Sequence, residues 1–227
     1  MNPKIKLLQS AVLFADLPES EIEELAAVAH LQKLEQEQTL FVKGDPGNQL
    51  FIVVRGVIRI SAISAEGKET TLNLLHAGQM FGEIALLDGQ DRTANATAHE
   101  MSELLVLERR DLMGFLDRNP EAMRRMLVAV CSRLRWVSEQ LEDAHFLDLP
   151  RRLAKRILLL TRLFGQKHSE GGIRIAIQLS QQDLAELLVV TRESVNRQLK
   201  LWESEGIMTL KAGYLVVTDL EALEAIG

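Results

Sequence analysis

The segment FGEIALLDGQDRTANATA, residues 81–98, contains side chains that can bind an anion together with hydroxyl groups. Gly82 and Glu83 stand near its start, and Arg92 and Thr93 follow nine to ten residues later among small side chains. A carboxylate accepts hydrogen bonds from ribose hydroxyls, and a guanidinium donates two hydrogen bonds to phosphate oxygens. Small side chains let backbone N–H groups approach the anion. We therefore expect a phosphate-binding loop here; the alternative is a solvent-exposed acidic loop after a strand.

The composition indicates a folded protein of one large domain or two small ones. The chain has 227 residues, of which 47% are hydrophobic, so disorder is not expected. The first ten residues, MNPKIKLLQS, contain no apolar stretch typical of a signal peptide. No apolar run approaches the roughly 18 residues of a membrane helix. These features predict a cytoplasmic protein that has no membrane partner.

Cysteine and histidine are too few and too scattered to predict a metal centre. The single cysteine, Cys131, excludes an intramolecular disulfide, and an iron–sulfur cluster needs about four cysteine ligands. The five histidines do not form the cluster that a structural zinc site requires. Hydrolysis of a bound nucleotide would need a metal cluster or an activated nucleophile, and the sequence has neither pattern. We therefore expect no metal and no enzymatic activity.

The charge is unevenly distributed along the chain. The formal net charge is −6, which by itself argues against a nucleic-acid partner. From residue 149 to the end, however, there are 11 Lys and Arg against 9 Asp and Glu, a net +2, whereas the preceding part carries 15 and 23, a net −8. The positive surplus therefore lies in the C-terminal part of the chain.

The hydrophobic pattern changes from helical to strand-like near residue 39. Residues 18–30, PESEIEELAAVAH, have one apolar face and acidic residues in the first turn, which predicts a capped helix. Between residues 39 and 107, β-rich runs of four to eight residues alternate with turn signals such as GDPGN and AEGKE. Many short strands at regular spacing indicate a β-barrel or sandwich.

Residues 118–146 are expected to form one long helix with a narrow apolar seam. The seam residues recur at intervals of 4, 3, 4, 3, 4 and 3, the a/d pattern of a coiled coil. They are Met123, Leu127, Val130, Leu134, Val137, Leu141 and Ala144. A strict, narrow seam favours a parallel homodimer; the alternative is a helix that packs on its own domain. Asp148 and Pro150 then predict a hinge at about 145–149 and a helix over 150–164.

Residues 180–206 have the pattern of a helix–turn–helix motif. Ser180 and Asp183 form a capping box for a short first helix, and Thr191 is placed to cap the second. Residues 207–218, IMTLKAGYLVVT, predict a hairpin that would form a wing.

The second helix of this motif carries polar side chains that can read bases. Arg192, Glu193, Asn196 and Arg197 lie near its N-terminal end, which enters the major groove in such motifs. Arginine can donate twice to guanine, and glutamate can accept from cytosine N4. The sequence therefore predicts a double-stranded DNA partner; the alternative is a generic helical hairpin.

Three segments together resemble one family. The segment 81–98 resembles the phosphate-binding cassette of cyclic-nucleotide-binding domains, whose pattern is FGE-hydrophobic-A-L followed by R-small-A. RESVNR resembles the recognition helix of the catabolite-activator branch of the CRP/FNR regulators, and FLDLPRRLAKRILLL is similar to that family's hinge and following helix. The resemblance covers nearly the whole chain. It implies an α+β protein with a cyclic-nucleotide-binding β-roll at 1–117, a dimerisation helix and hinge at 118–147, and a winged helix–turn–helix domain at 148–227.

The resemblance also implies which residues contact the nucleotide. Glu83 and the Gly82 amide would bind the ribose 2′-hydroxyl, while Arg92 and Thr93 would bind the cyclic phosphate. The full implied set is Gly82, Glu83, Ile84, Ala85, Arg92, Thr93, Val137 and Ser138.

The identity of the base stays open. In the catabolite activators a Thr–Ser pair on the dimer helix holds adenine, and alignment places Val137 at the threonine while keeping Ser138. Valine cannot hydrogen-bond an exocyclic amine, so one adenine contact is missing. The RTA triplet, which contains Thr93, is similar to the cassettes of cGMP-binding kinases, in which that threonine contacts guanine. We therefore expect cAMP, cGMP or both as an allosteric ligand.

For DNA, the resemblance implies a TGTGA-like palindrome bound by the homodimer, with RNA polymerase as a further partner. Arg192, Glu193 and Arg197 would read bases. The residues implied to contact phosphates are Ser180, Gln182 and Thr191. Nucleotide binding would shift the population toward the DNA-binding state.

Two alternatives within the same fold remain. One is a regulator with another effector, such as a haem-bound gas, for which His76, His99 and Cys131 are the only candidate ligands. The intact Glu83 and Arg92 pair argues against it. The other is a DNA-binding protein that needs no ligand.

Overall fold

The two central strands of the N-terminal half have apolar side chains on both faces. In the computed structural model, which describes residues 3–15, 17–169, 171–211 and 213–227, these strands are β3 (Gln49–Arg55) and β8 (Ser102–Glu108), paired antiparallel. Because successive side chains of a strand alternate between faces, Leu50 and Ile52 enter one hydrophobic cluster and Phe51 and Val53 enter another. Both faces of this pair are therefore covered.

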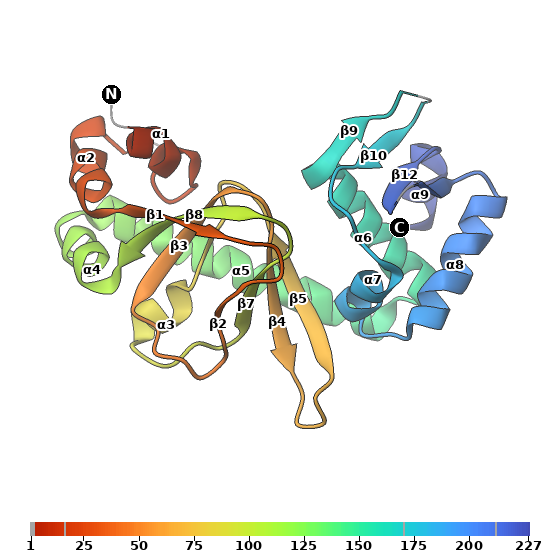
Figure 1. The fold of residues 1–227 in the computed structure, drawn as a ribbon, viewed down its shortest axis with the longest axis horizontal. Coiled ribbons are helices and arrows are strands. Elements are labelled where there is room, and N and C mark those ends of the chain that lie inside the picture. Colours follow the sequence, from red (N-terminus) through yellow and green to blue (C-terminus); the bar gives the residue numbers. More distant parts are fainter. Residues whose placement is uncertain (1–2, 16, 170, 212) are drawn as a thin grey trace. The chain divides into compact units, whose positions relative to one another are not determined.

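Two four-stranded antiparallel sheets form the β-roll (Figure 1). The first has the order β1-β8-β3-β6 and adds β1 (His30–Leu34) and β6 (Met80–Phe81). The second has the order β2-β7-β4-β5 and consists of β2 (Thr39–Phe41), β7 (Asn95–Ala98), β4 (Ile58–Ile63) and β5 (Glu69–Leu75). Phe51 and Phe81 stack with ring centroids 5.1 Å apart in one cluster.

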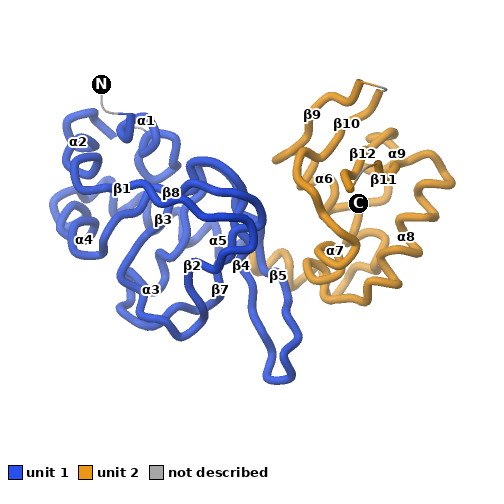
Figure 2. The backbone as a smooth tube through the Cα atoms, in the orientation of Figure 1, with its two compact units in different colours: residues 1–135 blue, residues 136–227 orange. Residues whose placement is uncertain are grey.

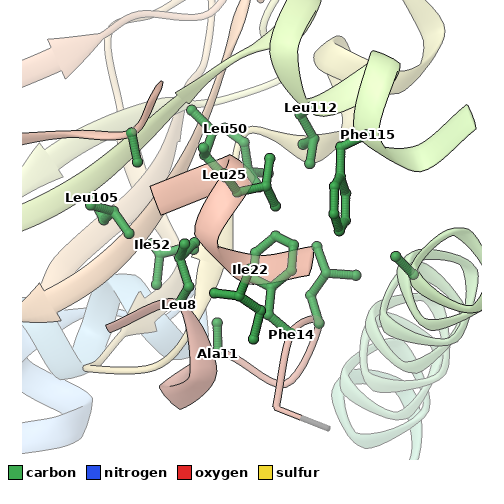
Figure 3. Packing of buried hydrophobic residues seen from close by; sticks show 14 of the residues in the cluster. Leu8, Ala11, Phe14, Ile22, Leu25, Leu50, Ile52, Leu105, Leu112 and Phe115 are labelled. Atoms are coloured by element: carbon green, nitrogen blue, oxygen red, sulfur yellow. The ribbon is translucent and has the colours of Figure 1, made fainter. Parts of the chain in front are cut away.

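Helices cover the other face of β3 and β8. They are α1 (Pro3–Ser10), α2 (Glu19–Val28) and α4 (Arg109–Arg118). Figure 3 shows Phe14, Ile22, Leu25 and Phe115 packed together in this cluster. Phe14 and Phe115 meet edge to face, with ring centroids 6.4 Å apart.

The long helix is present as α5 (Pro120–Phe146). The predicted seam leaves large apolar side chains on its surface: Leu127, Leu134, Val137 and Leu141 are between 48 and 66% exposed. Met123 and Val130 of the seam are only partly exposed.

The C-terminal part forms a winged helix–turn–helix fold. Its helices are α6 (Leu149–Phe164), α7 (Gln181–Leu188), α8 (Arg192–Ser204) and α9 (Leu220–Ile226). Its antiparallel sheet has the order β11-β12-β10-β9, from β9 (Gly165–Lys167), β10 (Ile173–Ile175), β11 (Met208–Lys211) and β12 (Tyr214–Val217). The predicted caps are confirmed: Asp148, Ser180 and Thr191 each accept a backbone N–H at the start of α6, α7 and α8, and the capping box of Ser180 and Asp183 is complete.

Several local expectations were wrong or incomplete. Gly82 and Glu83 begin a short helix, α3 (Glu83–Asp88), rather than an open loop. The helix expected over residues 18–30 ends at Val28, and its N-cap, Pro18, makes no side-chain hydrogen bond. The sequence alone predicted no separate elements for α1, β1, α4, β9 or α9.

The chain divides into two compact units inside α5 (Figure 2). The first is Met1–Arg135 and the second is Trp136–Gly227, whereas the sequence-based boundaries were placed at 117 and 147. The last part of α5 belongs with the second unit because its side chains contact α6: Asp143 pairs with Lys155, and Gln140 accepts from Arg156. The boundaries at 117 and 147 divide the chain by expected function and remain a proposal.

Candidate nucleotide-binding site and DNA-reading helix

Gly82 connects β6 to α3 in a conformation that favours glycine. Its φ is 83°, in the left-handed region, and it forms the N-cap of α3. A Cβ at this position would lie 2.6 Å from Arg92 Nη1 and 3.0 Å from the Gln49 carbonyl oxygen. The close approach of the Arg92 guanidinium to this turn therefore depends on the missing side chain.

Glu83 is a buried carboxylate with one oxygen still available. Its side chain is paired with Arg133 of α5, whose Nη1 lies 2.8 Å from Glu83 Oε1, and the residue is 2% exposed. Arg133 Nη2 donates to the Met80 carbonyl at 3.0 Å. Glu83 Oε2 is buried and has no hydrogen-bond partner among the described residues. An uncompensated buried carboxylate oxygen is costly, so this atom is available to a hydroxyl donor.

Arg133 was not among the expected site residues. In the sequence Arg133 does not stand out, since it lies one position before the seam residue Leu134 among several other charged residues. Its contact with Glu83 spans fifty residues of sequence, and no local pattern indicates such a pair.

Arg92 is a buried cation held from several directions. Its Nη1 and Nη2 donate to the carbonyls of Gly82 at 3.0 Å and Gln49 at 2.9 Å, and its guanidinium lies 4.3 Å from the centre of the Phe41 ring. Burial lowers the pKa of Arg92, while Glu83 and Asp45 raise it. An arginine keeps its charge under these conditions, and its Nε has no hydrogen-bond partner in the described structure.

The GDPGN turn holds the Arg92 backbone. Arg92 N donates to the Asp45 carbonyl at 2.8 Å, and Gly44 N donates to the Arg92 carbonyl at 2.9 Å. A Cβ on Gly47 would lie 2.1 Å from the Ala85 Cβ, so this turn also approaches α3 closely. The turn that the sequence marked as a strand connection thus positions the cassette arginine.

Glu83, Arg92 and Arg133 line one hollow at the surface of the first unit. Its empty volume is about 360 Å³, part of it open to solvent. The lining residues are Phe41, Ile60, Phe81, Gly82, Glu83, Ile84, Ala85, Arg92, Thr93, Ala94 and Arg133. The expected cassette residues are therefore together, and Thr93 is exposed there. A lining that combines a carboxylate, guanidinium groups and apolar side chains can hold a polar anion attached to a flat ring.

Val137 and Ser138 lie on α5 in the second unit. Their contact with a nucleotide stays a prediction.

The second unit exposes most of the expected DNA-contacting residues. Arg192, Glu193 and Arg197 are exposed on α8. Asn196 differs from the expectation, because it is only partly exposed and its Oδ1 accepts from Gln181 Nε2 of α7 at 3.0 Å. Asn196 therefore connects the two helices of the motif.

Among the described residues, no group of three or more His, Cys, Asp or Glu side chains could hold a metal ion. No helix within the described ranges is long and apolar enough to cross a membrane.

Comparisons with known proteins identify two domain families in the chain. Residues 31–119 match the cyclic nucleotide-binding domain family, and residues 151–226 match the Crp-like helix-turn-helix domain family. A protein of Thermus thermophilus named cyclic AMP receptor protein is 31% identical over 97% of this chain and 98% of its own length. A Mycobacterium tuberculosis protein named CRP-like cAMP-activated global transcriptional regulator is 29% identical over 96% of this chain and 97% of its own.

Solved structures share the fold. The structure of FixK2 from Bradyrhizobium japonicum aligns with a TM-score of 0.78 at 20% identity, over 88% of this chain and 97% of its own. The Mycobacterium tuberculosis relative is named a transcriptional regulator. With its cyclic nucleotide-binding domain and its DNA-binding helix–turn–helix, the chain belongs to the CRP/FNR family of transcriptional regulators.

Proposed function

We propose that this protein is a homodimer that binds cAMP, cGMP or both, and that nucleotide binding raises its affinity for a palindromic DNA site. One observation carries the ligand class: Glu83 Oε2 and Arg92 Nε are buried, lack partners in the described structure, and belong to residues lining the same hollow. An acceptor and a cationic donor in this arrangement suit a ribose hydroxyl and a phosphate.

A nucleotide in the hollow would add to the contacts already present. Its 2′-hydroxyl would donate to Glu83 Oε2, and a phosphate oxygen would accept from Arg92 Nε and the exposed Thr93 hydroxyl. Arg133 holds the other oxygen of Glu83 and lines the hollow, so the ligand would lie beside this cation. The hollow is lined by two guanidinium groups, those of Arg92 and Arg133, and by one carboxylate, that of Glu83. This net positive charge favours an anionic ligand over a neutral nucleoside.

The choice between the two nucleotides rests on few residues. Two of the relatives described above are named for cAMP, which favours that ligand. Val137 and Thr93 favour admitting cGMP as well, because valine offers no hydrogen bond to the adenine amine. Isothermal calorimetry with each nucleotide measures the preference directly.

The exposed apolar side chains of α5 support the dimer. Leu127, Leu134, Val137 and Leu141 recur at heptad spacing and are about half exposed or more. Such a row is typical of a coiled-coil seam. A parallel dimer would present two α8 helices to DNA, and helix–turn–helix dimers bind half-sites about 34 Å apart.

The deciding experiment measures DNA affinity by fluorescence anisotropy with cAMP, cGMP or no nucleotide. The probe is a duplex with two TGTGA-type half-sites, and the control duplex has one half-site scrambled. We expect nucleotide to strengthen binding to the intact palindrome, with a smaller effect on the control. Absence of binding heat with both nucleotides, together with unchanged DNA affinity, would refute this proposal and favour a regulator with another effector or none.

A further inference from the structure

Helix α5 carries a second heptad stripe beside the apolar seam. Its members precede the seam residues by one position and recur at the same intervals of 4, 3, 4, 3, 4 and 3. They are Ala122, Met126, Ala129, Arg133, Trp136, Gln140 and Asp143, and all of them are buried or partly buried within the single chain. The seam faces solvent for most of its length, whereas this second stripe, which we call the inner stripe, is in contact with the rest of the same chain.

The middle of the inner stripe contacts the candidate nucleotide site. Arg133 donates to Glu83 Oε1 at 2.8 Å and to the Met80 carbonyl at 3.0 Å. This position of α5 is therefore restrained by the carboxylate that the nucleotide would use.

The last three positions of the inner stripe contact α6. The guanidinium of Arg156 lies 5.9 Å from the centre of the Trp136 ring, and Arg156 Nη2 donates to Gln140 Oε1. Lys155 Nζ lies 2.6 Å from Asp143 Oδ1. We call these five residues the joint.

Within the joint, Arg156 has the strongest constraint. The Lys155–Asp143 pair is partly exposed to water, and such pairs contribute little by themselves. Arg156 is 8% exposed, and a buried guanidinium must keep its partners. Burial lowers the pKa of Arg156, and the Asp143 carboxylate raises it. The side chain remains charged and depends on the face of Trp136 and the Gln140 carbonyl.

The joint spans the segment that the sequence marked as the hinge. Trp136, Gln140 and Asp143 precede residues 145–149, and Lys155 and Arg156 follow them. The joint therefore connects the parts of the chain that precede and follow this segment. The compact units instead divide between residues 135 and 136, directly after the turn of α5 that carries Arg133.

We propose that Arg156 is a positioning residue that makes the winged helix follow α5, so that a change at Arg133 reaches α8. The inference rests on the proposed function, because Arg133 responds to a ligand only if the hollow binds one. Without the joint, α6 would turn freely about residues 145–149 and nucleotide occupancy would no longer affect DNA affinity. Nucleotide binding itself would persist, since none of the five residues of the joint lines the hollow.

The test compares Arg156→Met with Arg162→Met in the full-length protein. Methionine keeps an unbranched apolar side chain against Trp136 and removes the charge. Arg162 is exposed on the same helix, so the control makes the same chemical change away from the joint. DNA affinity is measured with and without saturating cAMP, and cAMP affinity is measured by calorimetry. Far-UV circular dichroism and thermal unfolding verify that each variant is folded.

We expect the stimulation of DNA binding by cAMP, typically about 5- to 150-fold for coupled sites, to fall to within about twofold of unity in Arg156→Met. In Arg162→Met it should stay at the wild-type value, even if DNA binding itself weakens. If Arg156→Met does not fold, the double variant Gln140→Ala with Asp143→Ala replaces it in the test. This variant removes contacts of the joint from the α5 side, and we expect the same loss of stimulation. Exchanging the pair, as Gln140→Arg with Arg156→Gln, should restore part of the stimulation.

The outcomes separate this inference from the proposed function. If cAMP stimulates DNA binding by the wild-type protein and stimulates folded Arg156→Met to the same extent, the role of the joint is overturned and the proposed function stands. If neither cAMP nor cGMP affects DNA binding by the wild-type protein, the proposed function fails and the role of the joint fails with it.

Discussion

Replacing Arg92 with lysine keeps the charge of the cassette and removes the planar guanidinium. Arg92 now donates to the carbonyls of Gly82 and Gln49, and its Nε remains for a ligand. A single ammonium cannot reach both carbonyls and a phosphate oxygen at once. Losing one hydrogen bond from a charged group costs about 1.5–3 kcal/mol, so nucleotide should bind roughly 10- to 150-fold more weakly.

Alanine would be a less informative replacement. It would leave the carbonyls of Gly82 and Gln49 without their donors and remove the cation from the Phe41 ring. Two such hydrogen bonds amount to roughly 3–6 kcal/mol, a large part of the total stability of a typical domain. A lost binding signal could then reflect unfolding.

The matched control is Arg109→Lys. Arg109 Nε donates to the Leu86 carbonyl of α3 at 2.7 Å, so it supports the same helix, yet it does not line the hollow. Calorimetry with cAMP and cGMP should show nucleotide affinity within about threefold of wild type for this control, because its hydrogen bond is made equally in the free and bound states. Thermal unfolding of both variants measures the stability loss separately.

Equal loss of nucleotide affinity in Arg92→Lys and Arg109→Lys would refute the reasoning, because it would assign the effect to the cassette backbone. Unchanged affinity in Arg92→Lys would show that the guanidinium does not contact the phosphate.

Three further outcomes are expected. Leu141→Glu should make the protein monomeric in analytical ultracentrifugation, because it places a charge on the seam, whereas Val12→Glu, at an exposed apolar position off α5, should not. Arg197→Ala should reduce base preference by about 1–3 kcal/mol at one position of the site, whereas Gln182→Ala, at a position implied to contact phosphate, should weaken all sequences alike; equal effects of the two would contradict base reading. Val189 has a φ of 55° in the turn before α8, so Val189→Asn should relieve strain and stabilise the protein by about 1 kcal/mol in thermal unfolding; a lower melting temperature would contradict this.

The elements that the sequence predicted correctly are those set by local chemistry. Caps act within three or four residues, so Asp148, Ser180 and Thr191 marked the starts of α6, α7 and α8. The heptad spacing of the seam predicted α5, because this spacing places the seam residues on one face of a helix. The strand β1 was missed because His30–Leu34 is mostly exposed and has little apolar alternation, and its strand conformation comes from pairing with β8.

In the candidate site, the sequence identified the cassette and did not identify its partners. Gly82, Glu83 and Arg92 were recognisable from type and spacing, and the structure places them around one hollow. Arg133 was not, because its pairing with Glu83 joins residues that are fifty positions apart. Asn196 was expected on the DNA-reading face, but the packing of α7 on α8 places it beside Gln181.

The sequence by itself therefore determined the family and the starts of several helices, since these depend on residue types at short spacing. The tertiary structure decided which of the two adjacent stripes of α5 contacts its own chain and which remains exposed. Both stripes have the same heptad intervals, so spacing cannot distinguish them. Only folding brings Glu83 to Arg133 and Arg156 to Trp136.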